Sequence, residues 1–408
     1  MQLQPDDPSR LQPRKPQRYR LPPVVQPQWR MGDLLRAVHP QRVDDLRRSL
    51  CERYGVRHCL LLDRARSGVF LLCKAFGLEG EWILTSLMHR PTAVVLANHS
   101  AGVAFADVDE HMTIAPASAE RMISPRTSAI LATHTYGKAA DVAALRELAD
   151  RRGVALIENA VHLASGCQVA GRPLGAWGDA SVLSFNVDKP LGGILGGALL
   201  TNRDDIWNAV SRYALGPPNT KEMRERVRTT YTAYRLKPWL LKLPVGRRHR
   251  GAVDGFNEIE RFAADEYRTF TPRGIHPLQA GVALSCLQRE SEFTRIRREH
   301  AQHLDERMRS DPRFSLPVST AERPHTFTYY PLILREGSRA ELGEHLAKEG
   351  IESKWRLAPL HMQAGFTDAP RDDLSVGDRA WKQHLLLPIG PSTSRGDIDY
   401  LVDTLRAW

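Results

Sequence analysis

Residues 154–202 decide the fold, and they read VALIENAVHLASGCQVAGRPLGAWGDASVLSFNVDKPLGGILGGALLTN. Three apolar runs stand out in this stretch: VALIEN at 154–159, SVLSFN at 181–186 and GALLTN at 197–202. Apolar runs of this length, separated by glycine-rich and polar segments, are typical of buried strands. Lys189 lies three residues beyond the second run and precedes a cluster of glycines. A lysine in such a position is a candidate for chemistry.

Outward from this stretch, strand-like runs alternate with helical ones. Residues 41–54 have apolar residues at helical spacing, and CLLLD at 59–63 is a strand-like run. Residues 140–153 predict an amphipathic helix that ends at Gly153. The alternation predicts an α/β fold with a mainly parallel sheet flanked by helices. Catalytic residues in such folds lie at the carboxyl ends of strands, as IEN and SFN do here.

The rest of the chain suggests three regions. Residues 1–27 are rich in Pro, Gln and Arg, so we expect a flexible arm. Residues 28–255 are expected to form the large domain, with a basic excursion at 203–250. Residues 256–408 are expected to hold a long helical pair (255–310) and a smaller C-terminal α+β domain, with a strand at TYYPLIL and helices at SRAELGEHLAKEGI and RGDIDYLVDTLRAW.

Composition narrows the class of protein. The 408 residues are 42% hydrophobic and 25% charged, which is typical of a globular protein. The N-terminal segment lacks the apolar core of a secretory signal, and no apolar run is long enough to span a bilayer, so we expect a cytoplasmic protein. The five cysteines have neither zinc-site spacing nor partner histidines. No metal site is therefore expected.

The net charge of +10 is concentrated in one segment. Residues 221–250 hold ten Lys or Arg and two Glu, a local balance of 10 − 2 = +8. A local excess does not favour nucleic-acid binding by the whole protein. This segment alternates Lys with Trp and Leu at LKPWLLKLPVG, so it is suited either to a membrane surface or partner, or to a surface excursion that caps the active site.

The sequence around Lys189 resembles that of the DegT/StrS class of sugar aminotransferases, which depend on pyridoxal 5′-phosphate (PLP). That class reads approximately E-D-A-A-[QH]-x-x-G, then G-x-x-G-D-x-x-x-F-S-F-[HN]-x-x-K, and this chain has IENAVHLASG and GAWGDASVLSFNVDK at the same places. The resemblance extends from about residue 40 to the end. It implies a large PLP-transferase domain with a seven-stranded sheet and a small C-terminal domain.

The resemblance also implies site residues. Lys189 matches the Schiff-base lysine, Ser184 a phosphate-binding serine, and His162 a position near the cofactor's 3-oxygen. Asn186 falls where the class has His or Asn. RARSGVFLL (64–72) resembles S-G-T-x-A-L, which implies that Gly68 and Val69 cradle the phosphate at a helix start. His89 takes the position of an aromatic ring that stacks on the pyridine.

Four departures from the class distinguish this chain. Asn159 stands where the class has an aspartate that charges the pyridine nitrogen, and an amide supplies no such charge. Val69 replaces a threonine and loses its hydroxyl. Pro272 replaces an asparagine that reaches the partner subunit's phosphate, and G-I-L-G-G at 193–197 replaces G-E-G-G. The pocket is therefore expected to be atypical.

As implied by the resemblance, the expected activity is transfer of an amino group from an amino acid, with glutamate expected, to a nucleotide-linked keto-sugar. The expected assembly is a homodimer. Two alternatives remain at this stage: elimination or dehydration on the same scaffold, and a degenerate relative without catalytic activity. Retention of Lys189, Ser184 and His162 favours an enzyme, whereas Val69, Asn159 and Pro272 favour a degenerate protein.

Overall fold

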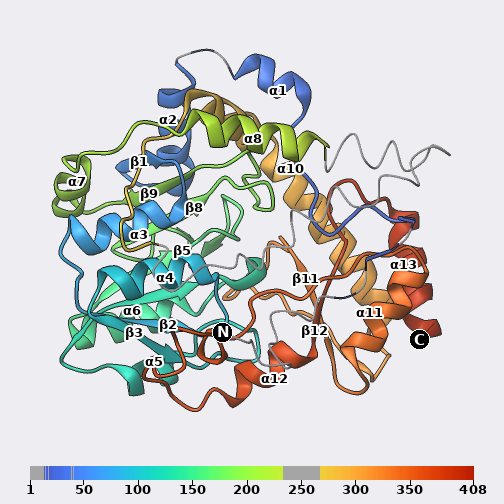
Figure 1. The fold of residues 1–408 in the computed structure, drawn as a ribbon. Coiled ribbons are helices and arrows are strands. Elements are labelled where there is room, and N and C mark those ends of the chain that lie inside the picture. The colour runs from blue at the N-terminus through green and yellow to red at the C-terminus, as the bar shows by residue number, and fades with distance from the viewer. Residues whose placement is uncertain (1–12, 14, 17, 38, 40, 233–266) are drawn as a thin grey trace.

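The structure is a computed structural model that describes residues 13, 15–16, 18–37, 39, 41–232 and 267–408. It has an α/β region built on a large sheet and, beside it, a region built on a small antiparallel sheet (Figure 1). The predictions made for residues 1–12 and for 233–266 lie outside the described residues.

Seven strands form the large sheet, in the order β1-β9-β8-β5-β4-β2-β3. The strands are β1 (His58–Leu62), β2 (Glu81–Thr85), β3 (Gly102–Ala106), β4 (Thr127–Thr133), β5 (Ala155–Asn159), β8 (Ala180–Ser184) and β9 (Gly197–Thr201). All neighbouring pairs are parallel except the two that β9 makes with β1 and β8. The expected mainly parallel sheet is therefore confirmed.

Helices cover both faces of this sheet. One face packs against α2 (Arg42–Tyr54), α5 (Pro116–Met122) and α6 (Val142–Arg152), and the other against α3 (Ala65–Lys74), α4 (Arg90–His99) and α7 (Asp204–Ser211). The amphipathic pattern of α6 explains its place, because Leu145, Leu148 and Ala149 are buried and Gly153 ends the helix in the left-handed conformation. The remaining small elements here are α1 (Met31–Arg36), η2 (Thr135–Gly137), β6 (Gln168–Val169), β7 (Arg172–Pro173) and α8 (Thr220–Tyr231).

The second region has a three-stranded antiparallel sheet, β10-β11-β12. Its elements are β10 (Phe314–Ser315), β11 (Tyr330–Leu334), α11 (Arg339–Lys348), η6 (Leu360–Met362), α12 (Ser375–Gln383), β12 (His384–Leu387) and α13 (Arg395–Ala407). The strand and the two helices predicted at the C-terminal end are confirmed. A separate hydrophobic core lies between this sheet, α11, α13 and the end of α10.

One long helix, α10 (Pro277–Met308), lies in the described part of the span 255–310, where a helical pair was expected; residues 255–266 lie outside the described residues. The helix starts sharply because Pro277 occupies its first position and His276 caps it, with Nδ1 accepting a hydrogen bond from Leu278 N at 3.1 Å. Figure 1 shows α10 running from α1 and α2 to α13. It therefore joins the two regions.

Residues 18–29 form a strap across the two regions, rather than the flexible arm expected there. Val24 N donates to Glu352 Oε2 at 2.8 Å, and Gln28 Nε2 donates to the backbone oxygen of Lys189 at 3.2 Å. Leu21, Val24 and Val25 are buried. The segment is ordered because these apolar side chains, which lie between its prolines and glutamines, pack against the rest of the protein.

No helix among the described residues is both long enough and apolar enough to cross a membrane.

Candidate active site

A cavity of about 230 Å³ opens at the carboxyl ends of the parallel strands. The last residues of β4, β5 and β8, which are Thr133, Asn159 and Ser184, all line it. Because parallel strands end at the same edge of a sheet, residues far apart in sequence meet there. The strand ends chosen from the sequence therefore face one cavity.

Lys189 lies in the wall of this cavity, with 12% of its side chain exposed. Its Nζ lies 2.9 Å from His162 Nε2 and 3.1 Å from Asp188 Oδ2. Behind it, the backbone oxygen of Lys189 accepts the hydrogen bond from Gln28 of the strap. The amine is thus held among polar groups inside a partly desolvated site.

Asp188 was not predicted from the sequence, although it directly precedes Lys189. Its side chain is 4% exposed, and Oδ2 also accepts hydrogen bonds from Tyr329 Oη at 2.9 Å and from Arg356 NH1 at 2.8 Å. Burial opposes its ionisation, but the charges of Lys189 and Arg356 hold the pKa of Asp188 well below its ordinary value. The carboxylate is therefore charged at neutral pH. An acidic residue beside the lysine was the only sequence signal for it.

His162 is buried against aromatic rings of two other segments. Its ring stacks with Tyr136 and meets Tyr329 edge-on, and its backbone oxygen accepts a hydrogen bond from Thr328 Oγ1 at 2.6 Å. Burial first, and then the charge of Lys189, hold the pKa of His162 well below its ordinary value. The imidazole is neutral, and its buried Nδ1 has no hydrogen-bond partner among the described residues. It has a polar atom left for a ligand.

Asn159 ends β5 and is buried at the base of the cavity. Its Nδ2 donates to Thr133 Oγ1 at 3.3 Å. The preceding residue, Glu158, fixes this strand end, because its buried carboxylate accepts hydrogen bonds from the backbone of Gly175, Trp177 and Gly178. The G-A-W-G-D motif is therefore a support for β5.

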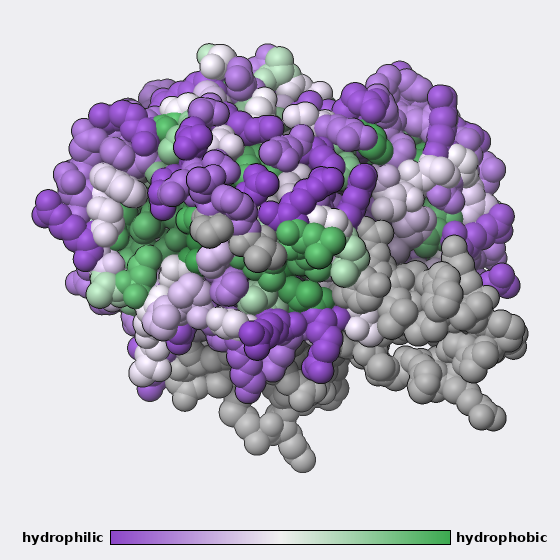
Figure 2. Space-filling model, turned by 90° about the horizontal axis from the view of Figure 1, so that it is seen from above, coloured by the Kyte–Doolittle hydropathy of each residue, from purple (hydrophilic) through white to green (hydrophobic). Residues whose placement is uncertain are grey.

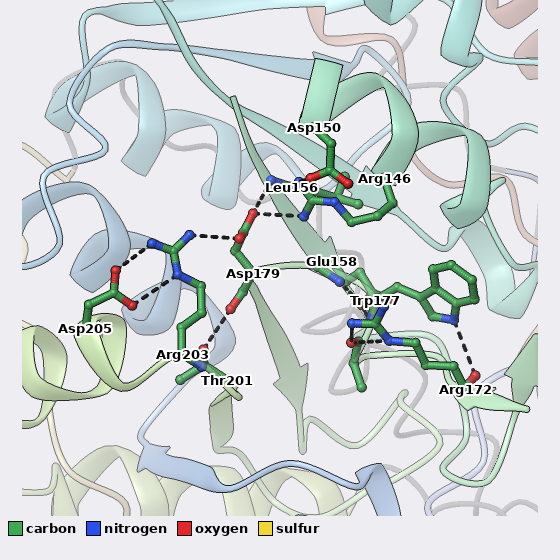
Figure 3. Close-up of polar contacts among 12 residues, drawn as sticks. Arg146, Asp150, Leu156, Glu158, Arg172, Trp177, Asp179, Thr201, Arg203 and Asp205 are labelled. Carbon is green, nitrogen blue, oxygen red and sulfur yellow. Dashed lines mark hydrogen bonds and ion pairs between the residues drawn. The ribbon is translucent and has the colours of Figure 1, made fainter. Parts of the chain in front are cut away.

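The aspartate of that motif, Asp179, also has a structural role, and its polar contacts are shown in Figure 3. Asp179 Oδ2 accepts from Leu156 N at 2.9 Å and from Arg146 NH1 at 3.0 Å, while Oδ1 accepts from Arg203 NH1 at 2.8 Å. Although burial opposes ionisation, these hydrogen bonds hold the pKa of Asp179 below its ordinary value. The motif thus ties β5, β8, α6 and the end of β9 together, away from the cavity.

Gly68 and Val69 are not in the cavity, so the prediction that they cradle a phosphate is wrong. The helix α3 already begins at Ala65, and Val69 is fully buried in the core beneath it. A Cβ on Gly68 would lie 2.9 Å from Val182 Cγ1, which places this glycine against the sheet. The residues at the helix start that line the cavity are Arg64, Ala65 and Arg66. The Ser-Gly pair misplaced the helix start by one turn.

The other predicted residues line the cavity. His89 precedes α4, and burial, followed by the charge of Lys189, lowers its pKa to about 3. Ser184 and Asn186 lie together on the segment leading to Lys189, where Ser184 Oγ accepts from Asn186 N at 3.4 Å. Pro272 does not line it; its backbone oxygen accepts a hydrogen bond from Gly216 N.

The described part of the basic segment reaches the cavity as well. Arg226, on α8, is one of the lining residues, and Glu222 of the same helix forms an ion pair with Arg64. This observation favours the reading in which 221–250 caps the active site. The LKPWLLKLPVG stretch lies outside the described residues.

Positive charge dominates the cavity. Among the described residues that line it, seven are Lys or Arg and one, Asp188, is a carboxylate; the seven are Arg64, Arg66, Arg90, Lys189, Arg226, Lys354 and Arg356. Some of these charges are already paired, as Arg64 is with Glu222. A wall of this kind suits ligands that carry several negative charges. The arrangement offers an amine nucleophile beside an anion-binding surface.

The sequence and the fold are similar to those of known proteins. A curated relative from Micromonospora megalomicea subsp. nigra, named a dTDP-3-amino-3,4,6-trideoxy-alpha-D-glucose transaminase, is 27% identical over 375 residues, which cover 90% of this chain and 89% of the relative.

Solved structures share the fold. DesI in the presence of its TDP-sugar product superposes with a TM-score of 0.74 at 23% identity and covers 97% of this chain and 93% of its own. DesV from S. venezuelae, solved in complex with a ketimine intermediate, superposes with a TM-score of 0.70 at 22% identity, with 92% and 93% covered. The family description that matches residues 36–406 is that of the DegT/DnrJ/EryC1/StrS aminotransferases. The chain belongs to the DegT/DnrJ/EryC1/StrS aminotransferase family.

Proposed function

We propose that this protein transfers an amino group from an amino acid, with glutamate as the expected donor, to a nucleotide-linked keto-sugar, and that Lys189 carries its cofactor, PLP. The observation that carries the proposal is the place of Lys189. Its Nζ lies in a cationic cavity at the strand ends, 2.9 Å from a buried neutral histidine. Lysine in a partly desolvated site is a suitable nucleophile for a cofactor aldehyde.

The residues present fit that cofactor. Ala65 and Arg66 would hold its phosphate, because the start of α3 presents backbone N–H groups and Arg66 adds a positive charge. Ser184 and Asn186 would complete the phosphate site, as the family resemblance implies. The buried Nδ1 of His162, which has no partner among the described residues, is available for hydrogen bonding. Asn159 would face the ring nitrogen.

Bound PLP supplies a ring that accepts electrons and stabilises negative charge on the carbon that bears the amino group. The chain's own residues supply the rest. With PLP present, Nζ of Lys189 would serve as the base that takes up the proton lost from the Cα of the amino donor. His162 and His89, whose low pKa values keep them neutral, hold the site without adding positive charge. The burial of Lys189 limits contact with water.

The substrate follows from the charge of the cavity. Arg226 and Arg356, from α8 and from the second region, stand on the wall with Arg66. A guanidinium group binds two oxygens of one phosphate or carboxylate at once, through two parallel N–H donors. A nucleoside diphosphate on the sugar and the carboxylates of glutamate are ligands of this kind. The relative that acts on a dTDP-linked amino sugar, by its name, supports the same class of substrate.

Other chemistry is less well supported. The dehydratase branch of this class replaces the lysine by histidine, whereas Lys189 is present and lines the cavity. A degenerate, non-catalytic relative has no need of a buried amine paired with both a carboxylate and an imidazole. Both observations favour amino transfer.

We also infer a homodimer. Figure 2 views the molecule from the side that carries α1 and α8 in Figure 1, and it shows a hydrophobic patch within a mainly hydrophilic surface. On α1, Met31 is 52% exposed and Leu35 is 80% exposed. Apolar side chains exposed on one helix face favour an interface, and a second copy of this chain is the expected partner. A molar mass of two chains in light scattering would support this inference.

An absorption spectrum of the purified protein with PLP tests the proposed function. We expect a cofactor band that borohydride reduces irreversibly and that glutamate converts to the band of the aminated cofactor. Lys189→Ala should abolish covalent attachment, because it removes the only amine that we assign to it. The absence of a covalent band from the wild-type protein would contradict the proposal.

A matched control is available in the same cavity. Lys354 also lines it, so Lys354→Ala removes a lysine of similar surroundings. The covalent band should persist in that variant. Mass spectrometry of the borohydride-reduced protein should place the cofactor on the peptide that contains Lys189. A label on the Lys354 peptide would show that the wrong lysine was assigned.

A further inference from the structure

The charges that line the cavity affect the protonation of the Lys189 amine. An amine among so many cations, in a partly desolvated site, is expected to lose its proton easily, because both burial and neighbouring positive charges disfavour the ammonium form. The structure nevertheless places one carboxylate against it. Asp188 Oδ2 lies 3.1 Å from Nζ, and Asp188 is the only acidic residue among the described residues that line the cavity.

The position of that carboxylate differs from the position expected in this class. The usual acid stands at the end of β5, where this chain has Asn159. Here the negative charge lies instead at the amine end of the cavity, on the residue next to Lys189. With a neutral amide at one end and a carboxylate at the other, the described residues that line the cavity include a single buried negative charge.

Asp188 is held in place by residues from two other segments. Tyr329 Oη and Arg356 NH1 both donate to Oδ2, the same oxygen that contacts Nζ, and Arg356 also contacts Tyr329 Oη. The other oxygen, Oδ1, is buried and has no hydrogen-bond partner among the described residues. The carboxylate therefore cannot turn outward without giving up three contacts.

We propose that Asp188 is the charge partner of Lys189: its carboxylate stabilises the ammonium form of the free amine and so sets the pH at which the amine becomes nucleophilic. This proposal deepens the proposed function, since it concerns the lysine to which PLP is assigned. Whenever Nζ is not bonded to the cofactor, Asp188 pairs with it. Arg356 and Tyr329 limit the strength of that pairing by sharing Oδ2.

Several other groups also influence the charge of the Lys189 amine. Titratable and charged residues face the Asp188–Lys189 pair from α3, from the start of α4, and from the segments that follow β5, precede β11 and follow α11; they are Arg66, His89, His162, Tyr329, Lys354 and Arg356. The two histidines are neutral near pH 7, because burial lowers the pKa of each. The remaining cations act against the ammonium form. Asp188 is thus the one carboxylate among the described residues of the cavity that favours it.

The test uses the protein without cofactor. A small acylating reagent reacts only with neutral amines, so the labelling rate of Lys189, followed by peptide mass spectrometry from pH 6 to 11, gives its titration midpoint. Asp188→Asn keeps the shape and removes the charge. We expect it to lower the midpoint by about 1–3 pH units, the usual effect of an opposite charge within ~4–6 Å. Equal midpoints in the two proteins would overturn the proposal.

A second variant guards against misfolding of the first. Tyr329→Phe removes a neutral hydrogen-bond donor from Asp188 Oδ2 and leaves the charge of the cavity unchanged. The carboxylate then interacts more strongly with Nζ, so the midpoint of Lys189 should rise. A role of Asp188 in packing alone would leave the midpoint of this variant at the wild-type value. Asp204→Asn is the control, since Asp204 is an exposed carboxylate that contacts Arg57 and His58.

The outcomes separate this proposal from the proposed function. Labelling requires no cofactor, so a shifted midpoint supports the role of Asp188 even if no PLP band is found. Conversely, a covalent PLP band with equal midpoints would support the proposed function and overturn the role of Asp188. In the loaded protein, the pH dependence of the band should shift in Asp188→Asn in the same direction as the free amine.

Discussion

Asn159 is the residue that sets this site apart, because it is an uncharged group where the proposed cofactor's ring nitrogen is expected. Its amide is buried and bonded to Thr133 Oγ1. Asn159→Asp would add the missing charge. We predict that the glutamate half-reaction of the loaded variant, followed by stopped-flow absorbance, accelerates at least about tenfold, which corresponds to ~1.4 kcal/mol.

The same substitution should carry a cost without cofactor. A buried carboxylate with incomplete hydrogen bonding destabilises the folded state by roughly 1–3 kcal/mol. In urea unfolding, the cofactor-free variant should therefore have a lower free energy of unfolding than the wild type. Addition of PLP should raise the free energy of unfolding more in the variant than in the wild type. Asn208→Asp, at an exposed position of α7, controls for net charge. An unchanged half-reaction would refute the charge argument for Asn159.

At this scale the sequence predicts part of the site. Lys189, Asn159, His162 and Ser184 all reach the cavity, because their order along strand ends is enough to bring them together. Asp188 was not predicted, although it is adjacent to Lys189 in the sequence.

The partners of Asp188 could not be found from sequence. Tyr329 and Arg356 lie 141 and 168 residues away from it, and no periodicity or spacing connects them. Such contacts depend on how the second region packs against the first.

At the scale of elements, the start of α3 shows the limit of a local pattern. Ser67 and Gly68 suggest a helix start, yet Arg64 precedes the first helical residue and Ala65 and Arg66 line the cavity. The position of this helix start depends on a residue in β9. A Cβ on Gly197, at the start of β9, would lie 2.5 Å from Ala65 N and 2.6 Å from Arg64 C. The first turn of α3 therefore depends on a glycine more than a hundred residues later.

Gly197→Ala tests this dependence. The added methyl group must push the first turn of α3 away from β9, so we expect a loss of stability of about 1–3 kcal/mol and weaker binding of PLP. Denaturant unfolding and a PLP titration measure the two effects. Gly32→Ala is the matched control, since a Cβ at Gly32 in α1 meets nothing within 4 Å. That change should be neutral or stabilising by up to ~1 kcal/mol, and equal effects of both substitutions would contradict the prediction.

Other elements were predictable to different degrees. Strong patterns with clear ends, such as α6 with Gly153, agree between sequence and structure. Of the helical pair expected at 255–310, the described residues hold one helix of 32 residues, α10, which crosses from one region to the other. The division into domains at about residue 255 stays a prediction, since α10 packs against α1 and α2 as well as α13.

For the whole molecule, buried histidines predict the response to acid. Burial holds the pKa of His162 and His325 well below the ordinary value and lowers the pKa of His89 and His384 to about 3. In the unfolded chain histidine titrates near ~6.5, so below that pH the unfolded state binds more protons and stability falls as pH falls. At pH 5.5 each such histidine contributes a loss of about 1.4 kcal/mol.

Urea unfolding at pH 7.5 and 5.5 measures this loss. His384→Gln removes one proton site, and its side chain can still bond Tyr136 Oη, which lies 3.0 Å from His384 Nε2. The stability lost between the two pH values should be smaller in the variant by about 1.4 kcal/mol. Identical losses in both proteins would show that His384 is not held neutral.

The strap of residues 18–29 has a consequence for the order of events during synthesis. Val24 and its partner Glu352 are 328 residues apart, and Gln28 of the same strap supports the backbone of Lys189. At ribosomal rates of roughly 5–20 residues per second, the strap waits about 20–60 s for the segment on which it docks. The strap therefore docks on the second region only near the end of translation, and we expect the completed chain to bind the proposed cofactor.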